Sequence, residues 1–66
     1  MFDYEPYRNL LKERKLKQSD LIERNVINRQ NASKLKNNQS ITLDTLDKIC
    51  NKLDCDFSDI VRHYKE

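Results

Sequence analysis

The stretch Gln18–Asn37, QSDLIERNVINRQNASKLKN, decides how this chain is interpreted. It predicts a short helix over 18–24, a turn over 25–27 and a second helix over 29–36 that Asn28 caps. The second helix opens with polar side chains that both donate and accept hydrogen bonds, which suits the edges of DNA bases, while its lysines suit phosphates. The stretch therefore favours two helices joined by a tight turn, of which the second reads DNA.

One face of the second helix carries the candidate base-reading side chains. Ala32 and Leu35 mark its opposite, buried stripe. Arginine pairs bidentately with guanine and glutamine with adenine, when a helix presents them in the major groove. The predicted base readers are Arg29, Gln30, Ser33 and Lys34. The alternative is that these side chains only solvate an exposed helix.

Phosphate contacts are expected around this face, because they hold a reading helix in register without reading sequence. The N-terminus of the first helix can offer backbone N–H groups and side-chain donors to one phosphate. The residues that follow the second helix can reach another. The candidate phosphate-binding residues are Lys17, Gln18, Asn28, Asn31, Lys36, Asn37 and Asn38.

The positive charge of the chain is concentrated on the same segment. The net charge is only +2, yet residues 8–36 hold nine Lys or Arg against three Asp or Glu. Residues 41–66 hold four basic and six acidic side chains. A basic excess of this kind fits a nucleic-acid face, although an ordinary solvated helical surface would account for the charge equally well.

Three further helices are predicted around this pair. Pro6 suits the first position of a helix over 6–15, and Thr42 caps a helix over 43–53. Apolar residues recur at helical spacing in the latter at Leu43, Leu46, Ile49, Cys50 and Leu53. Asp56 is the expected cap of a fifth helix. The core-facing residues of that helix are predicted to be Phe57, Ile60 and Val61.

The length of 66 residues predicts one small domain, 1–66, with the helix-turn-helix unit at about 18–36. The expected fold class is all-α, a compact bundle of five short helices, to which the two termini could add a short strand pair. No apolar run approaches the ~20 residues that cross a membrane, and no signal-peptide pattern is present. We therefore expect no membrane contact and a cytoplasmic protein.

The chain lacks the residue patterns of a metal centre or an active site. Cys50 and Cys55 have only His63 beside them, whereas zinc takes four ligands, so both are expected to be buried free thiols. There is no glycine for a phosphate-binding loop and no nucleophile–base spacing around His63. The sequence thus predicts no enzyme, no cofactor and no small-molecule substrate.

An ordered set of positions extends from Gln18 to Val61. Its members are Gln18, Leu21, Ile27, Asn28, Leu35, Thr42, Leu43, Leu46, Ile49, Cys50, Leu53, Phe57, Ile60 and Val61. Leu16 through Val61 thereby resembles the helix-turn-helix domain of the Cro and lambda-repressor-like regulators, also called the xenobiotic-response-element type. The opening DYEPYRNLLKERKL resembles a compact subgroup that begins with a short strand and a proline.

This resemblance implies an all-helical fold, a dimer, and the occupancy of operator DNA. Carried over by position, Arg29, Gln30 and Lys34 match base readers of that family. Gln18 and Asn37 match its phosphate-binding positions.

Two departures from the family pattern affect the helix-turn-helix unit. Val26 stands where the turn usually has glycine, and a β-branched residue held at positive φ would cost on the order of 1–2 kcal/mol. Ala32 replaces a larger apolar residue, so the core beside the second helix is expected to be thin. The angle between the two helices therefore depends on how this turn is built.

The leading hypothesis is a sequence-specific DNA-binding transcriptional regulator, a repressor. It would bind an inverted-repeat operator in double-stranded DNA as a homodimer, with the helix over 29–36 in the major groove. The alternative is a protein-interaction module on the same fold, an antitoxin or docking domain without specific DNA reading. In that case Phe2, Tyr4, Tyr64 and the fifth helix would contact a partner protein.

Overall fold

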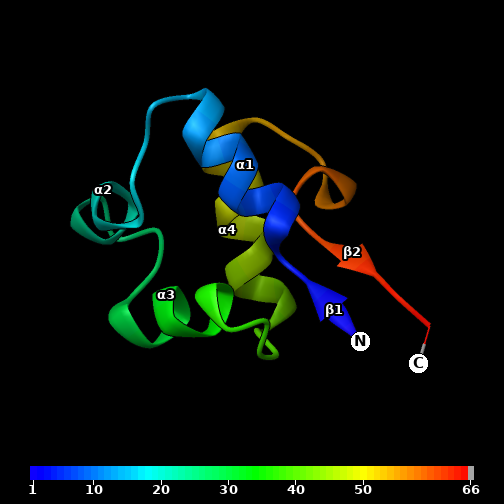
Figure 1. The fold of residues 1–66 in the computed structure, drawn as a ribbon. Helices are drawn as coiled ribbons and strands as arrows, with labels where there is room; N and C mark the ends of the chain where they lie inside the picture. The colour runs from blue at the N-terminus through cyan, green and yellow to red at the C-terminus, as the bar shows by residue number, and fades with distance from the viewer. Residues whose placement is uncertain (66) are drawn as a thin grey trace.

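The computed structural model describes residues 1–65, which form four α-helices, a 3₁₀ turn and a pair of two-residue strands. In chain order these are β1 Phe2–Asp3, α1 Glu5–Glu13, α2 Gln18–Glu23, α3 Arg29–Lys36, α4 Leu43–Leu53, η1 Phe57–Asp59 and β2 Arg62–His63. Figure 1 shows α1 in front of α4, with α2 and α3 to one side of them and the two strands to the other. The helix-turn-helix pair thus lies on the side of the molecule away from the chain ends.

A single cluster of apolar side chains joins all four helices. Its buried members are Tyr4, Tyr7, Leu11, Leu21, Ile27, Leu35, Leu46, Ile49, Leu53, Ile60 and Val61. The largest share comes from α4, and α2 and α3 contribute one fully buried leucine each. Burial of this cluster, at roughly 25 cal/mol per Å² of apolar surface, is what holds the helices together.

The predicted bounds of α3 and α4 are confirmed, because each helix begins at a side-chain cap. Asn28 Oδ1 accepts a hydrogen bond from the Asn31 N–H at 2.7 Å, and Asn31 Oδ1 accepts one from the Asn28 N–H at 3.1 Å. Thr42 Oγ1 accepts from the Thr45 N–H at 3.3 Å. These bonds satisfy N–H groups that a helix leaves unpaired at its start. The helix predicted over 6–15 runs over Glu5–Glu13.

The prediction of a fifth α-helix was wrong. Residues Phe57–Asp59 form one 3₁₀ turn, which the Asp59 carboxylate closes by accepting a hydrogen bond from the Asp56 N–H at 2.9 Å. The chain then extends into β2 and pairs with β1, so it cannot continue as a helix. Ile60 and Val61 are buried as predicted, whereas Phe57 is 45% exposed and does not belong to the core.

Leu43 was also expected in the apolar stripe of α4, and it is 74% exposed. It is the first residue of the helix, one turn before the buried Leu46. The two wrongly placed residues, Leu43 and Phe57, therefore add apolar surface to the outside of the molecule.

The expected strand pair between the termini is present. Phe2 lies opposite His63 and Asp3 opposite Arg62 in an antiparallel pair. Met1 extends the pair, since the Tyr64 N–H donates to its carbonyl at 2.9 Å and its ammonium donates to the Tyr64 carbonyl at 3.0 Å. Both chain ends are thereby joined beside the start of α1. Among the described residues no helix has the length and apolar character to span a membrane.

Each α-helix ends in the same left-handed turn, although the chain has no glycine. The residues with positive φ are Lys15 at 55°, Asn25 at 58°, Asn38 at 56° and Asp54 at 51°. The N–H of the residue after each one donates to the carbonyl five positions back, at 2.8 to 3.1 Å. This is the Schellman pattern, in which glycine is the usual left-handed residue. Asn and Asp tolerate that conformation better than Lys.

Candidate nucleic-acid interface

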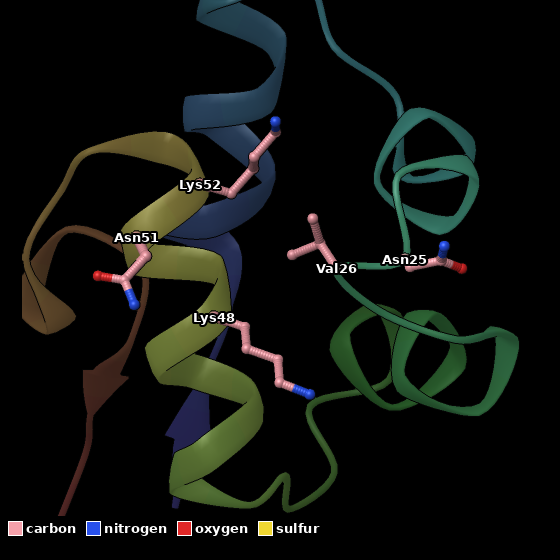
Figure 2. Close-up of a pocket in the computed structure, with 5 residues that line it drawn as sticks. All are labelled: Asn25, Val26, Lys48, Asn51 and Lys52. Atoms are coloured by element: carbon pink, nitrogen blue, oxygen red, sulfur yellow. The ribbon is translucent and has the colours of Figure 1, made fainter.

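The turn between α2 and α3 avoids the strain that Val26 was expected to introduce. The left-handed residue is Asn25, one position earlier than the resemblance implies, and Val26 does not have positive φ. The Val26 N–H donates to the Leu21 carbonyl at 2.9 Å, which closes α2. The Val26 side chain points toward α4 (Figure 2) and is half-buried against the core. The turn is thus built from ordinary asparagine and valine geometry, and it fixes the start of α3.

The outer face of α3 presents three of the four predicted base readers side by side. Arg29 and Gln30 lie in the first turn and Ser33 follows one turn later, all of them exposed. Lys34 is half-buried and lies at the edge of this row. On the opposite side Leu35 is fully buried, so the outer face cannot rotate inward without exposing it. The row of Arg29, Gln30 and Ser33 is named the outer row below.

Four of the seven predicted phosphate-binding residues have exposed side chains: Lys17, Asn28, Lys36 and Asn37. Lys36 and Asn37 continue the exposed face beyond Ser33. The Asn37 Nδ2 donates a long hydrogen bond to Ser33 Oγ, at 3.5 Å. Lys17 precedes α2, where its N–H donates to Asp20 Oδ2 at 2.8 Å. These positions leave lysine ammonium and amide donors available to an anion.

The exposed Asn28 and the half-buried Asn31 cap α3 with their side-chain carbonyl oxygens. Capping uses the acceptor atom of each amide, and a phosphate requires a donor. Their NH₂ groups are therefore compatible with both roles.

Gln18 and Asn38 are bonded inside the molecule. Gln18 Oε1 accepts from the Tyr7 hydroxyl and Gln18 Nε2 donates to the Ala32 carbonyl, both at 3.2 Å. Asn38 Oδ1 accepts from the Tyr4 N–H at 2.9 Å. The side chain of Gln18 thus links three helices, and what remains for a phosphate is one Nε2 hydrogen and the backbone N–H groups at the start of α2.

The stretch of sequence that contains the outer row has basic side chains and no acidic ones, whereas Asp20 and Glu23 lie on the preceding α2. Residues 24–43 include Arg24, Arg29, Lys34 and Lys36 and contain no Asp or Glu. The acidic side chains of residues 41–65 belong to α4, η1 and the segment between them. A local excess of positive charge attracts a polyanion, and it does so more strongly at low salt.

A shallow hollow of about 340 Å³ lies beside the turn, between it and α4. It is lined by Asn25, Val26, Lys48, Asn51 and Lys52. Figure 2 shows the Val26 side chain facing α4, with Lys52 above it and Lys48 below it in this view. Lys48 and Lys52 are one turn apart on α4 and add positive charge on this side of the helix-turn-helix pair. The i, i+4 spacing of the two lysines was visible in the sequence, but their position beside the turn was not.

The cysteines are free and half-buried rather than fully buried. Burial, together with the neighbouring Cys50 and Asp59, raises the pKa of the Cys55 thiol to about 11. The pKa of Cys50 is also raised, chiefly by burial. Both sulfurs are therefore protonated thiols near neutral pH, which are poor nucleophiles and poor metal ligands. Within residues 1–65 no three His, Cys, Asp or Glu side chains are grouped closely enough to hold a metal ion.

Two residues important for the placement of α3, Tyr7 and Arg8, were not found from the sequence. Tyr7 is completely buried, and burial raises the pKa of its hydroxyl, which remains the hydrogen donor to Gln18. Arg8 donates to the Leu35 carbonyl at the end of α3 at 2.7 Å. Both contacts join residues far apart in the chain, so no local pattern indicates them.

Comparison with known proteins places this geometry in a known family. The family model of the Cro/C1-type helix-turn-helix DNA-binding domain matches residues 8–66. The crystal structure of the transcriptional regulator VanUg, form II, is similar to this chain with a TM-score of 0.90 and 32% sequence identity. The similarity covers 98% of this chain and 87% of that chain. No curated protein matches the sequence.

Proposed function

This chain belongs to the Cro/C1-type helix-turn-helix DNA-binding family, and on that premise we propose that it is a sequence-specific transcriptional regulator acting as a repressor. Its α3 lies in the major groove, and occupancy of an operator excludes other proteins from that DNA. The similarity to VanUg, described as a transcriptional regulator, supports a regulatory role.

The observation that carries the proposal is the exposed outer row within a stretch, residues 24–43, that has basic but no acidic side chains. Arg29 and Gln30 are exposed in the first turn of α3, where the recognition helix of this motif contacts base edges. Arg29 forms a bidentate pair with a guanine and Gln30 with an adenine, each worth about 1–3 kcal/mol of discrimination. Ser33 and Lys34 add contacts one turn further along, and Lys17, Lys36 and Asn37 bind the flanking phosphates.

A homodimer completes this mode of binding. One short helix contacts only a few base pairs, so two copies on an inverted repeat, about 34 Å apart, are needed to specify an operator. Exposed apolar residues outside α3 support a second copy as the partner. Phe2, Leu43 and Phe57 border a hollow of about 120 Å³ near the terminal strands and the start of α4.

Selection of bound sequences from a random DNA pool, followed by fluorescence anisotropy on the selected site, tests this function. We expect an inverted-repeat consensus and an affinity that falls steeply with salt. The affinity for the selected site should exceed that for scrambled DNA by at least about 10³. Enrichment of no sequence, with undetectable binding at low ionic strength, would rule the proposal out.

A protein-interaction module is the second candidate, because the aromatic rings of Phe2, Phe57 and Tyr64 are exposed, and Phe2 and Phe57 border the same hollow. Native mass spectrometry of protein purified from cells separates the two functions. A stoichiometric foreign protein bound to a chain that ignores DNA supports the module. A homodimer that shifts to a dimer–DNA complex supports the regulator.

A further inference from the structure

The C-terminal end of α3 is fastened to the N-terminal segment of the chain by a set of polar bonds. Helix geometry leaves the last carbonyl groups of α3 without partners inside the helix. Arg8 Nη1 donates to the Leu35 carbonyl at 2.7 Å and lies 3.4 Å from the Lys36 carbonyl. A guanidinium at this place also meets the negative end of the helix dipole, so the bond is charge-assisted.

Arg8 is itself held in position from the other side. Its Nη2 lies 3.4 Å from Asp3 Oδ1, which forms an ion pair, and its Nη1 lies 3.4 Å from Asn38 Oδ1. Asp3 is 8% exposed and also accepts from the Glu5 N–H at 3.0 Å, so its carboxylate cannot move away. The arginine fork is therefore fixed between α1, β1 and the end of α3.

Neighbouring bonds reinforce the same joint. The Tyr4 N–H donates to Asn38 Oδ1 at 2.9 Å, and the Tyr4 hydroxyl donates to the Gln39 carbonyl at 2.8 Å. One turn back along α3, the Tyr7 hydroxyl reaches the Ala32 carbonyl through Gln18. Consecutive residues of α1, Tyr7 and Arg8, thus hold α3 at two levels, near its middle and at its end.

From these contacts we propose that Arg8 is a positioning residue that sets the tilt of α3 and thereby the sequence selectivity of DNA binding. The inference rests on the proposed function. Base-edge hydrogen bonds require placement within about 0.5 Å, whereas a flexible lysine can still reach a phosphate after a small rotation. Loss of the Arg8 fork therefore weakens binding to the operator more than binding to unrelated DNA.

Arg14 provides a matched control within the same helix region. Arg14 is the residue directly after α1, whereas Arg8 lies inside that helix. The Arg14 Nη1 donates to the Leu53 carbonyl at the end of α4. Arg14→Lys removes the same kind of arginine–carbonyl bond from a helix that does not contain the outer row. Arg8→Lys and Arg14→Lys both keep the positive charge, so their comparison isolates geometry.

The experiment measures dissociation constants of both variants and the unaltered protein for the selected operator and for scrambled DNA, over a range of salt concentrations. For Arg8→Lys we expect operator affinity to fall about tenfold, with affinity for scrambled DNA within about twofold and an unchanged salt slope. Arg14→Lys should leave the ratio of the two affinities unchanged. An equal loss on both DNAs with a shallower salt slope would make Arg8 a phosphate contact and overturn the proposal, and so would an unchanged ratio.

A second measurement needs no DNA and separates this proposal from the proposed function. Amide chemical shifts of residues 32–39 should move in Arg8→Lys and stay in place in Arg14→Lys, with both proteins folded by circular dichroism. If the unaltered protein binds no DNA selectively, the proposed function fails, yet these shifts still decide whether Arg8 orients α3. If the amide chemical shifts of residues 32–39 are the same in Arg8→Lys as in the unaltered protein, the positioning role is overturned.

Discussion

Helices α3 and α4 are fixed in the same small fold by contacts of different kinds. α4 buries Leu46, Ile49 and Leu53 and takes its place in the core through apolar packing. α3 fully buries only Leu35, and polar bonds from Gln18 and Arg8 supply the rest of its attachment. A helix that keeps a polar face free for a ligand has fewer positions left for apolar residues that pack in the core. Its orientation then depends on directional hydrogen bonds.

The largest expected effect on stability comes from α4. Ile49 is completely buried, so Ile49→Ala leaves a cavity and should lower the free energy of unfolding by about 2–5 kcal/mol. For a domain of this size that is a large part of its total stability. Urea denaturation followed by circular dichroism measures the loss. Asp47→Ala, exposed on the same helix, should change it by less than about 0.5 kcal/mol. Equal effects of the two substitutions would contradict an apolar attachment of α4.

Arg29→Ala, on the exposed face of α3, should change DNA binding rather than stability. The side chain is exposed, so stability should stay within about 0.5 kcal/mol. Operator binding should weaken by about 1–3 kcal/mol with relaxed preference at one base position, because a bidentate base contact is removed. Anisotropy on operators substituted at each position measures this. Lys48→Ala, a loss of one exposed positive charge on α4, is the control and should relax no base position. A uniform loss on every sequence would show that Arg29 binds a phosphate.

The two N-caps offer a smaller and more direct test. Asn28→Ala removes an acceptor from a reciprocal pair with bonds of 2.7 and 3.1 Å, and should cost about 1 kcal/mol. Thr42→Ala removes a longer bond of 3.3 Å to the Thr45 N–H and a 3.0 Å contact between the two hydroxyls. Because the Thr45 hydroxyl can bond to water instead, a smaller loss is expected. Urea titration of both variants compares them. The reverse order would mean that the start of α3 is held by the turn before it rather than by its cap.

The parts of this fold that were predictable from the sequence are those set by neighbouring residues. Asn28 and Thr42 mark helix starts by local chemistry, and the bounds of α3 and α4 followed. The 3₁₀ turn was taken for a helix because the apolar spacing of residues 57–61 carries no sign that β2 must extend to meet β1, some sixty positions away in the chain. Family resemblance supplied the arrangement that local patterns could not.

In the candidate site, too, the features set by neighbouring residues were predictable and those set by distant residues were not. The exposed outer row was predictable, since helical spacing alone puts Arg29, Gln30 and Ser33 opposite Leu35. Its role in base reading stays a prediction. The internal bonds of Gln18 and Asn38 were not predictable, because their partners Tyr7 and Tyr4 lie on elements that only the tertiary fold brings near.

The smallest expected effects concern the left-handed residues that end α1 and α3. Lys15 and Asn38 have almost the same φ, 55° and 56°, but this left-handed conformation has a higher free energy for lysine than for asparagine. Lys15→Gly should therefore raise the free energy of unfolding by up to about 1 kcal/mol. Asn38→Gly should lower it, since glycine offers no Oδ1 to Tyr4 and Arg8. Thermal and urea unfolding of the two variants give the signs. Stabilisation by both would mean that backbone strain outweighs the side-chain bonds at the end of α3, and that its attachment depends less on polar contacts than its geometry implies.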